Sequence, residues 1–254
     1  FTDSGWDFDT TWYMLGGGSY PYLTNLPQTT VPDVVGLQEA EAIAALEEVH
    51  LGVNVSYESS VSVPPGAVIR QSVAAGESIN SGIRVAIDVS TGPPILISSI
   101  EELQLIGNDP AYPLDGDYAL TQDIDASVTA GWNDGAGFGP IGSVDLVFQD
   151  YSLTFSGNFD GQGHVISNLV INRPEEEVTG LFSVLNVGGN IRNLALEDID
   201  VAGGGNAGGL VGIVQRGTVS NCAVTGVISG WAEVGGLAGA NFSGTISGCS
   251  SSNS

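Results

Sequence analysis

One stretch of the chain has the hydrophobic spacing of an α-helix. Ala42, Ala45, Leu46 and Val49 fall at positions i, i+3, i+4 and i+7, and Ile43 lies alongside them. Glutamates occupy the remaining faces. Apolar residues at this period line one side of a helix and bury it against a neighbouring layer. The pattern therefore predicts an amphipathic helix between residues 39 and 50.

Apolar and polar residues alternate in several short runs after this helix. The runs lie at residues 53–57, 68–69 and 85–89, and turn-forming residues separate them at 64–66 and 75–77. Alternation with a period of two places successive side chains on opposite faces of a sheet. The runs therefore predict strands, and together with the helix they predict a compact α+β unit.

Residues 27–93 resemble a PASTA domain. The resemblance is carried by VPDVVGL at 31–37, LGVNV at 51–55 and VPPGAVIRQSVAAGESINSGIRVAIDVSTG at 63–92. It implies one helix packed on a three-stranded sheet. In kinases and penicillin-binding proteins such modules are associated with recognition of cell-wall peptidoglycan, and in many other proteins they resemble spacers. The resemblance implies no catalytic residue.

The C-terminal part of the chain repeats itself. Three pairs of residues are each 27 positions apart: Gly208 and Gly235, Gly217 and Gly244, and Cys222 and Cys249. A period of this size with short strands and no helical pattern is typical of one coil of a β-solenoid, in which equivalent residues stack about 4.8 Å apart. The predicted fold class is therefore mainly β, a parallel β-helix joined to a small α+β PASTA domain.

Each copy of the repeat has an apolar residue followed three positions later by Leu or Cys. We expect these residues to form inward structural ladders: Ile166 and Leu169, Ile191 and Leu194, Val219 and Cys222, Ile246 and Cys249. The spacings between successive copies are 25, 28 and 27 residues. Cys222 and Cys249 then stack in adjacent coils, either as buried small apolar side chains or as a disulfide between coils.

This region also resembles GLUG-motif repeats. The sequences Gly209-Leu210-Val211-Gly212 and Gly236-Leu237-Ala238-Gly239 carry the motif, and 155–169 resembles the segment that commonly precedes it. Such repeats occur in large secreted surface proteins and adhesins of bacteria and archaea. The resemblance implies architecture much more than ligand, and a secreted or cell-surface location.

Four segments follow from these patterns. We interpret 1–26 as the closing segment of a preceding solenoid or as a subunit-joining segment, and 27–93 as the PASTA domain. Residues 95–160 are expected to form the solenoid cap and first strands, with Ser99 capping a helix and Glu102 completing a capping box. Residues 161–254 are expected to form the coils. The whole reads as a mature or excised stretch of something longer.

The net charge of the chain restricts the classes of partner that we expect. The chain has 29 acidic residues against 5 Lys and Arg, which gives a formal net charge of −24. Nucleic acid is not an expected partner, because neutralising phosphates requires cationic side chains. Membrane insertion is not expected either, because no apolar run reaches the length of about 18 residues that a span requires.

Several acidic and amide side chains are candidate ligands for a calcium ion. The candidate ligands are Asp123, Asp125, Asn133 and Asp134, which lie in short acidic or turn-like sequences rather than in a complete calcium-loop pattern. Each of these sequences is also typical of a turn or an exposed edge. No transition-metal site is expected, because His50 and His164 are the only histidines.

The sequence predicts no catalytic and no cofactor-binding residue. Gly203-x-Gly205-x-x-Gly208 has dinucleotide-binding spacing but opens no helix, so we interpret it as a solenoid corner. The predicted function is a non-catalytic extracellular structural protein, either an adhesin stalk or a filament subunit that adds copies of itself head to tail. The alternative is binding of cell-wall or host glycan through the PASTA domain. A third is a polysaccharide-active solenoid enzyme, for which Asp123, Asp125 and Asp160 are the first carboxylates to consider.

Overall fold

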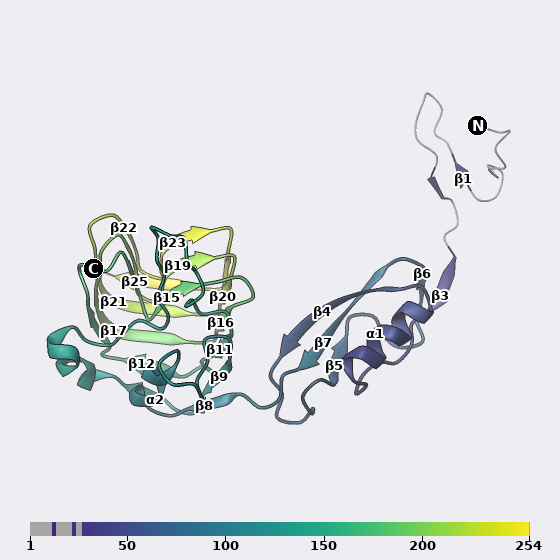
Figure 1. Ribbon diagram of the computed structural model, residues 1–254, viewed down its shortest axis with the longest axis horizontal. Helices are drawn as coiled ribbons and strands as arrows, with labels where there is room; N and C mark the ends of the chain where they lie inside the picture. The colour runs from purple at the N-terminus through teal and green to yellow at the C-terminus, as the bar shows by residue number, and fades with distance from the viewer. Residues whose placement is uncertain (1–11, 14–21, 24–26, 254) are drawn as a thin grey trace. The chain divides into compact units, whose positions relative to one another are not determined.

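The structure is a computed structural model that describes residues 12–13, 22–23 and 27–253 (Figure 1). The chain divides into two compact units, residues 1–93 and 94–254. Near the start, β1 (Trp12–Tyr13) pairs antiparallel with β2 (Tyr22–Leu23). The interpretation of 1–26 as a closing segment otherwise lies outside the described residues. Within the described part, no helix has the length and apolar character to span a membrane.

The first unit packs one helix on a three-stranded sheet, as the PASTA resemblance implies. The helix is α1 (Glu39–Glu48), and the sheet has the order β4 (Gly52–Glu58), β7 (Arg84–Ser90), β5 (Val68–Gln71). A second, two-stranded sheet pairs β3 (Gln28–Thr30) with β6 (Ser78–Asn80). Ala42 and Leu46 of the helix are fully buried in one cluster with Val85 and Ile87 of the central strand.

The second unit is a parallel β-solenoid, which confirms the predicted fold class. One complete coil consists of β16 (Asn190–Arg192), β17 (Ala195–Ala202), β18 (Asn206–Gly208) and β19 (Val211–Gln215). Each strand pairs in parallel with its equivalent in the next coil, so that four stacks of strands run along the solenoid (Figure 1).

The remaining strands occupy the same four stacks. The first stack also contains β8 (Ile95–Ile97), β9 (Asp117–Leu120), β11 (Asn158–Asp160), β20 (Thr218–Ser220) and β24 (Thr245–Ser247). The second contains β10 (Ile124–Asp125), β12 (Val165–Ser167), β13 (Val170–Asn172), β21 (Ala223–Ser229) and β25 (Ser250–Asn253). The third and fourth contain β14 (Val178–Thr179), β22 (Glu233–Gly235), β15 (Phe182–Leu185) and β23 (Ala238–Phe242).

A short helix, α2 (Ile100–Leu105), follows β8 and covers one end of the coils (Figure 1). Ser99 caps it as predicted, because the Ser99 Oγ accepts a hydrogen bond from the Glu102 N–H at 3.2 Å. Glu102 completes the box one residue earlier than expected: its Oε2 accepts from the Ser98 N–H at 2.7 Å. Ile100 and Leu103 are buried in the same core cluster as the coil residues, which ties the helix to the solenoid.

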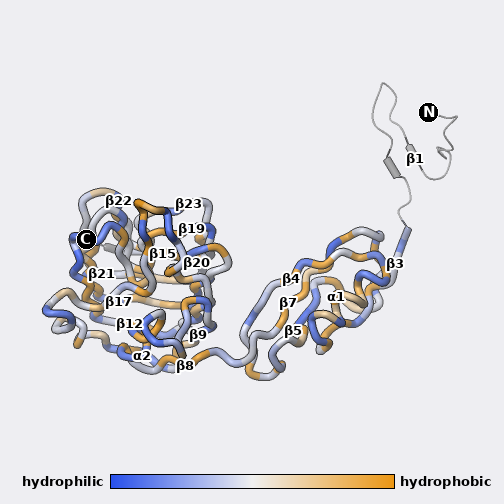
Figure 2. The backbone as a smooth tube through the Cα atoms, in the orientation of Figure 1, coloured by the Kyte–Doolittle hydropathy of each residue, from blue (hydrophilic) through white to orange (hydrophobic). Residues whose placement is uncertain are grey.

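Inward-pointing side chains form ladders along the solenoid. One ladder runs through the buried Tyr118, Phe159, Ile191 and Val219, which pair in register from coil to coil. Ile246 continues the register in the last described coil, but its side chain is 38% exposed rather than buried as predicted. Aromatic rings fill the core near α2, and aliphatic side chains replace them further along. Figure 2 shows how apolar and polar segments alternate along the backbone of both units.

The predicted register of the first copy is wrong. Ile166 pairs with Leu196 rather than with Ile191, whose partner in the preceding coil is Phe159. The later copies stack as predicted, since Ile191, Val219 and Ile246 are in register. The error has a local cause: Asn168 and Asn193 both adopt positive φ, 58° and 54°, and each is followed by a buried Leu. The same corner therefore occurs at two different places on the coil.

A bulge explains why the later spacings are 28 and 27. Between Leu196 and Ile199 the register of β17 shifts by one residue against β21. Asp198, with φ 54°, falls inside this shift, and its N–H donates to the Thr225 Oγ1 at 3.2 Å. An extra residue in one strand of a pair is accommodated by such a bulge, so both coils keep their corners aligned.

The two glycines of the Gly-Leu-x-Gly sequence lie where neighbouring backbones approach closely. A Cβ on Gly209 would lie 2.5 Å from the Gly236 carbonyl oxygen and 2.7 Å from the Val224 Cγ1. A Cβ on Gly212 would lie 2.7 Å from the Ser183 carbonyl oxygen. Real Cβ atoms do not approach backbone oxygens this closely, so the repeat requires glycine at both positions.

Gly209→Ala is therefore expected to lower the free energy of unfolding of the second unit by about 3 kcal/mol, because overpacking against backbone forces the coils apart. Gly131→Ala is the matched control, since a Cβ there meets nothing within 4 Å. We expect this control to have a free energy of unfolding equal to that of the parent. Denaturant unfolding followed by circular dichroism measures both, and equal effects of the two substitutions would contradict the packing argument.

Candidate functional site

Two of the predicted carboxylates hold neighbouring coils together. The Asp123 Oδ1 accepts hydrogen bonds from the Val165 N–H and the His164 Nδ1, both at 3.0 Å. The Asp125 Oδ1 accepts from the Asn168 Nδ2 at 3.0 Å. These bonds lower the pKa of both carboxyls, with the Val165 N–H the largest cause for Asp123 and the Asn168 amide for Asp125.

Asp160 is the most enclosed of the three carboxylates, with a side chain 14% exposed. Its Oδ2 forms an ion pair with the Arg192 Nε at 2.9 Å, and its Oδ1 accepts from the Asn193 Nδ2 at 3.0 Å and the Gln162 N–H at 2.9 Å. Burial is the largest single influence and raises the pKa of Asp160, but these hydrogen bonds and Arg192 outweigh it and lower the pKa overall.

The chemistry available to these carboxylates is that of acceptors. Hydrolysis of a glycosidic bond by paired carboxyls needs one carboxyl that keeps its proton at working pH, which requires a raised pKa. The pKa of Asp123, Asp125 and Asp160 is lowered instead. As hydrogen-bond acceptors they stabilise the stacking of coils.

Asn133 and Asp134 lie in a tight turn, the 3-10 segment η3 (Asn133–Gly135) that follows η2 (Ser127–Gly131). Both have positive φ, 52° and 55°, and the Asn133 Nδ2 donates to the Gly137 carbonyl at 2.7 Å. Within the described part of the chain, no three His, Cys, Asp or Glu side chains converge as a metal site requires. Asp123 and Asp125 thus contact the neighbouring coil, whereas Asn133 and Asp134 lie in a local turn.

Cys222 and Cys249 stack in adjacent coils as free thiols. The Cys222 N–H donates to the Cys249 Sγ at 3.4 Å. Cys222 is 2% exposed, and burial is the main cause that raises the pKa of its thiol to about 11. The structure thus matches the interpretation of Cys222 as a buried apolar side chain.

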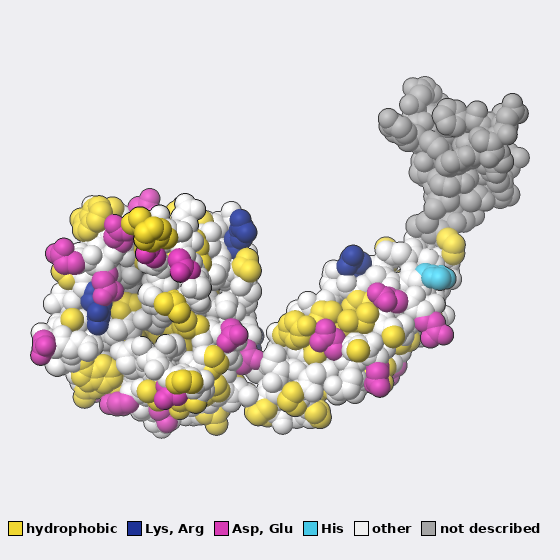
Figure 3. Space-filling view, viewed as in Figure 1, with side chains coloured by type: hydrophobic (Ala, Val, Ile, Leu, Met, Phe, Trp, Pro, Cys, Tyr) yellow, Lys and Arg dark blue, Asp and Glu magenta, His cyan; other side chains and the backbone are white. Residues whose placement is uncertain are grey.

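Charged side chains on the PASTA sheet pair with one another. Arg70 forms ion pairs with Glu58 at 2.6 Å and Asp88 at 2.5 Å, although its side chain is 60% exposed. The Tyr57 hydroxyl donates to Glu39 at 3.1 Å, which raises the pKa of Tyr57. Figure 3 shows acidic side chains distributed over the drawn face of both units, with few arginines among them.

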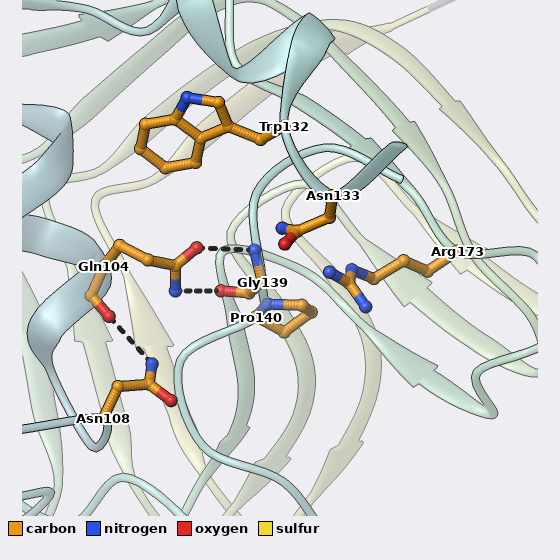
Figure 4. Close-up of a pocket in the computed structure, with 7 residues that line it drawn as sticks. All are labelled: Gln104, Asn108, Trp132, Asn133, Gly139, Pro140 and Arg173. Carbon is orange, nitrogen blue, oxygen red and sulfur yellow. Dashed lines mark hydrogen bonds between the residues drawn. The ribbon is translucent and has the colours of Figure 1, made fainter. Parts of the chain in front are cut away.

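A polar pocket of about 460 Å³ lies in the solenoid unit, between α2 and the segment around Gly139 (Figure 4). The residues that line it are Gln104, Asn108, Trp132, Asn133, Gly139, Pro140 and Arg173. We call it the Trp132 pocket. Its volume is within the range of roughly 300–1,000 Å³ that is usual for ligand sites.

The side chains of the Trp132 pocket are fixed by one segment of backbone, 137–139. The Gln104 amide donates to the Gly139 carbonyl at 3.0 Å and accepts from the Gly139 N–H at 2.7 Å. The Arg173 Nε donates to the Phe138 carbonyl at 3.1 Å, and the Trp132 ring stacks on Phe138 with centroids 6.3 Å apart. The pocket is therefore formed before any ligand arrives.

Sequence patterns did not predict this pocket. Its residues are scattered from 104 to 173 and none belongs to a recognised motif. The usable signal was Trp132, a large aromatic residue in the otherwise small and polar stretch Gly131-Trp132-Asn133-Asp134-Gly135. An aromatic residue in a turn sequence indicates a role other than turn formation.

Comparison with known proteins supports the PASTA domain, whose family matches residues 29–91. The chain is 41% identical to Halomucin of Haloquadratum walsbyi over 139 residues, which is 54% of this chain and 2% of that protein. It is 38% identical over 82 residues to the probable serine/threonine-protein kinase PknB of Corynebacterium glutamicum, covering 31% of this chain and 13% of the kinase. The chain thus spans a small part of each of these relatives.

Among solved structures, the chain resembles the extra-cellular region of the Ser/Thr kinase PrkC from Staphylococcus aureus. The sequence identity is 30%, the TM-score is 0.26, and the match covers 28% of this chain and 25% of that one.

Thiol reactivity is expected to differ between the two cysteines. With a pKa of about 11, only about one Cys222 thiol in a thousand is ionised at pH 8. Iodoacetamide should therefore modify Cys249 in the folded chain and reach Cys222 only after unfolding, as peptide mass spectrometry measures. Equal labelling of both thiols, or recovery of a disulfide-linked peptide pair, would contradict the structure.

Asp160→Asn is expected to destabilise the solenoid in a pH-dependent way. Because the folded-state pKa of Asp160 is lowered, its stabilisation is present above the ordinary carboxyl value of 3.8 and is lost as pH falls through the folded value. The difference in free energy of unfolding between parent and variant should thus be full at neutral pH and shrink in acid. Asp134→Asn removes the same charge from an exposed turn, and a similar pH-dependent difference there would sink the interpretation.

Proposed function

We propose that this chain is a structural, non-catalytic part of an extracellular surface protein. Solenoid coils supply a stiff element, and the PASTA domain supplies a spacer. The observation that supports this most is the unbroken register from β9 through β24, in which each coil adds to the one before it. Arrangements of this kind extend by repetition and resist bending, because each repeat packs on its neighbours.

The chemistry of the candidate residues agrees with this role. The three carboxylates considered for catalysis accept hydrogen bonds from neighbouring coils, and their lowered pKa values suit that task. The PASTA domain supports an extracellular setting, since this family is associated with the cell wall. We further propose that the coils are GLUG-type repeats of an adhesin stalk or of a filament built from copies of the chain.

Binding of cell-wall glycan through the PASTA domain is the second candidate. It is favoured by the match of residues 29–91 to the PASTA family. The exposed charged sheet around Arg70 is the surface on which such binding would be sought first.

Four measurements on the intact chain separate these functions. For a structural role we expect the chain to stay in the supernatant when purified peptidoglycan sacculi are pelleted, and to release no reducing ends from polysaccharides. Pulled at its two ends, the solenoid unit should lengthen by about 55 nm when it unfolds, at about 3.5 Å per residue. Negative-stain images then distinguish isolated rods from filaments.

If the chain instead pellets saturably with sacculi, and Arg70→Ala weakens this binding, the result would favour glycan binding by the PASTA domain over the structural role. Release of reducing ends from any polysaccharide would overturn the non-catalytic role outright.

A further inference from the structure

We infer that the Trp132 pocket binds an uncharged sugar residue of a glycan. Its lining combines a flat aromatic ring, two asparagine amides and a guanidinium around one opening (Figure 4). This site lies within the solenoid unit and is separate from the PASTA domain. The inference goes beyond the structural function proposed above and does not depend on it.

Trp132 supplies the surface on which a sugar ring stacks. A pyranose has a face of C–H groups and an edge of hydroxyls, so one side of it is apolar and fits against the electron-rich face of an aromatic ring. Trp132 is half-buried and rests against Phe138, which is fully buried. The indole is therefore held in place while part of it remains open to the pocket.

Asn108 and Asn133 supply partners for hydroxyl groups. The Asn108 Nδ2 donates to the Gln104 carbonyl at 2.8 Å, and the Asn133 Nδ2 donates to the Gly137 carbonyl at 2.7 Å. A side-chain amide has a second N–H and an oxygen with two lone pairs. Each amide is thus anchored by one N–H and keeps both donor and acceptor capacity, as hydroxyls that donate and accept require.

Charge selects against an acidic sugar. The Arg173 Nη1 is ion-paired with Glu176 Oε1 at 2.7 Å, and its Nε is bonded to the Phe138 carbonyl. Asp145, Glu176 and Glu177 line the adjoining pocket, which adds negative charge next to the site. A carboxylate-bearing sugar would be repelled by these nearby carboxylates and by the overall net charge of −24.

The site has room for more than one sugar residue. The adjoining pocket, of about 510 Å³, shares Gly139, Pro140 and Arg173 with the Trp132 pocket. The two together form a groove along the Gly139-Pro140 segment. A neutral oligosaccharide is therefore expected to bind more tightly than a single sugar.

The test is calorimetric titration of the intact chain with cellotetraose, maltotetraose and mannotetraose, and with tetragalacturonate as the acidic probe. We expect at least one neutral probe to bind saturably with a Kd below about 1 mM, and the acidic probe not to bind. Trp132→Ala should weaken the neutral probe about tenfold or more. Trp231→Ala is the matched control, because Trp231 is 71% exposed and lines neither pocket, and this variant should bind as the parent does.

Trp132 also packs on Phe138, so a second variant separates binding from folding. Asn108→Ala changes an exposed position with a single hydrogen bond to the Gln104 carbonyl, and it should weaken the neutral probe several-fold while lowering the melting temperature less than Trp132→Ala does. The inference is overturned if no neutral probe binds, if only tetragalacturonate binds, or if Trp231→Ala removes binding while Trp132→Ala does not. Loss of sacculus binding in Arg70→Ala concerns the PASTA domain and leaves this result unaffected.

Discussion

Parallel pairing between successive coils is the constraint on which the rest of the solenoid depends. Asn190, Thr218 and Thr245 are in register. Each inward side chain in this stack therefore lies between the equivalent residues of the preceding and following coils. The core must then be filled by ladders of matched apolar side chains, and close backbone approaches must be glycine. Gly209 and Gly212 meet the second demand, and the ladder through Ile191 and Val219 meets the first.

The same constraint acts on the polar surface. A residue at a coil corner has its equivalent one strand spacing away, so like charges would also stack. The structure instead alternates acceptors with donors: the Asp160 carboxylate accepts from Asn193, whose oxygen accepts from Asn221 at 3.4 Å. Arg192 adds the one positive charge in this column. An acidic chain can thus stack its coils without placing carboxylates on one another at this corner.

Local patterns in the sequence were sufficient for much of the fold. The helix of residues 39–48, the Ser99 cap and the stacking of the later copies each depend on residues close in sequence or on a constant period. The register of the first copy was missed because positive-φ asparagine followed by leucine occurs at two corners, at Asn168 and at Asn193. Local geometry alone does not say which corner a motif occupies.

The Trp132 pocket was missed for a different reason. Gln104 reaches Gly139 across 35 residues, and this contact exists because α2 docks against the first coil. Nothing in the spacing of those residues indicates that they meet. The repeat period of the sequence predicts which residues stack in ladders. It does not predict which polar and aromatic side chains meet when a helix docks against a coil.

The contrast between coils explains where such a pocket can form. Asp117 and Asn158 are neighbours in the first stack although 41 positions separate them, whereas Asn193 and Asn221 are 28 apart. The long first coil has residues beyond those that pairing uses, and these fold over the edge as η2, η3 and the segment around Gly139. Regular coils present stacked strands with few concavities, so a concave binding site needs an interruption of the repeat. In this chain the interruption lies beside α2, at the end of the solenoid where Trp132, Asn133 and Gln104 meet.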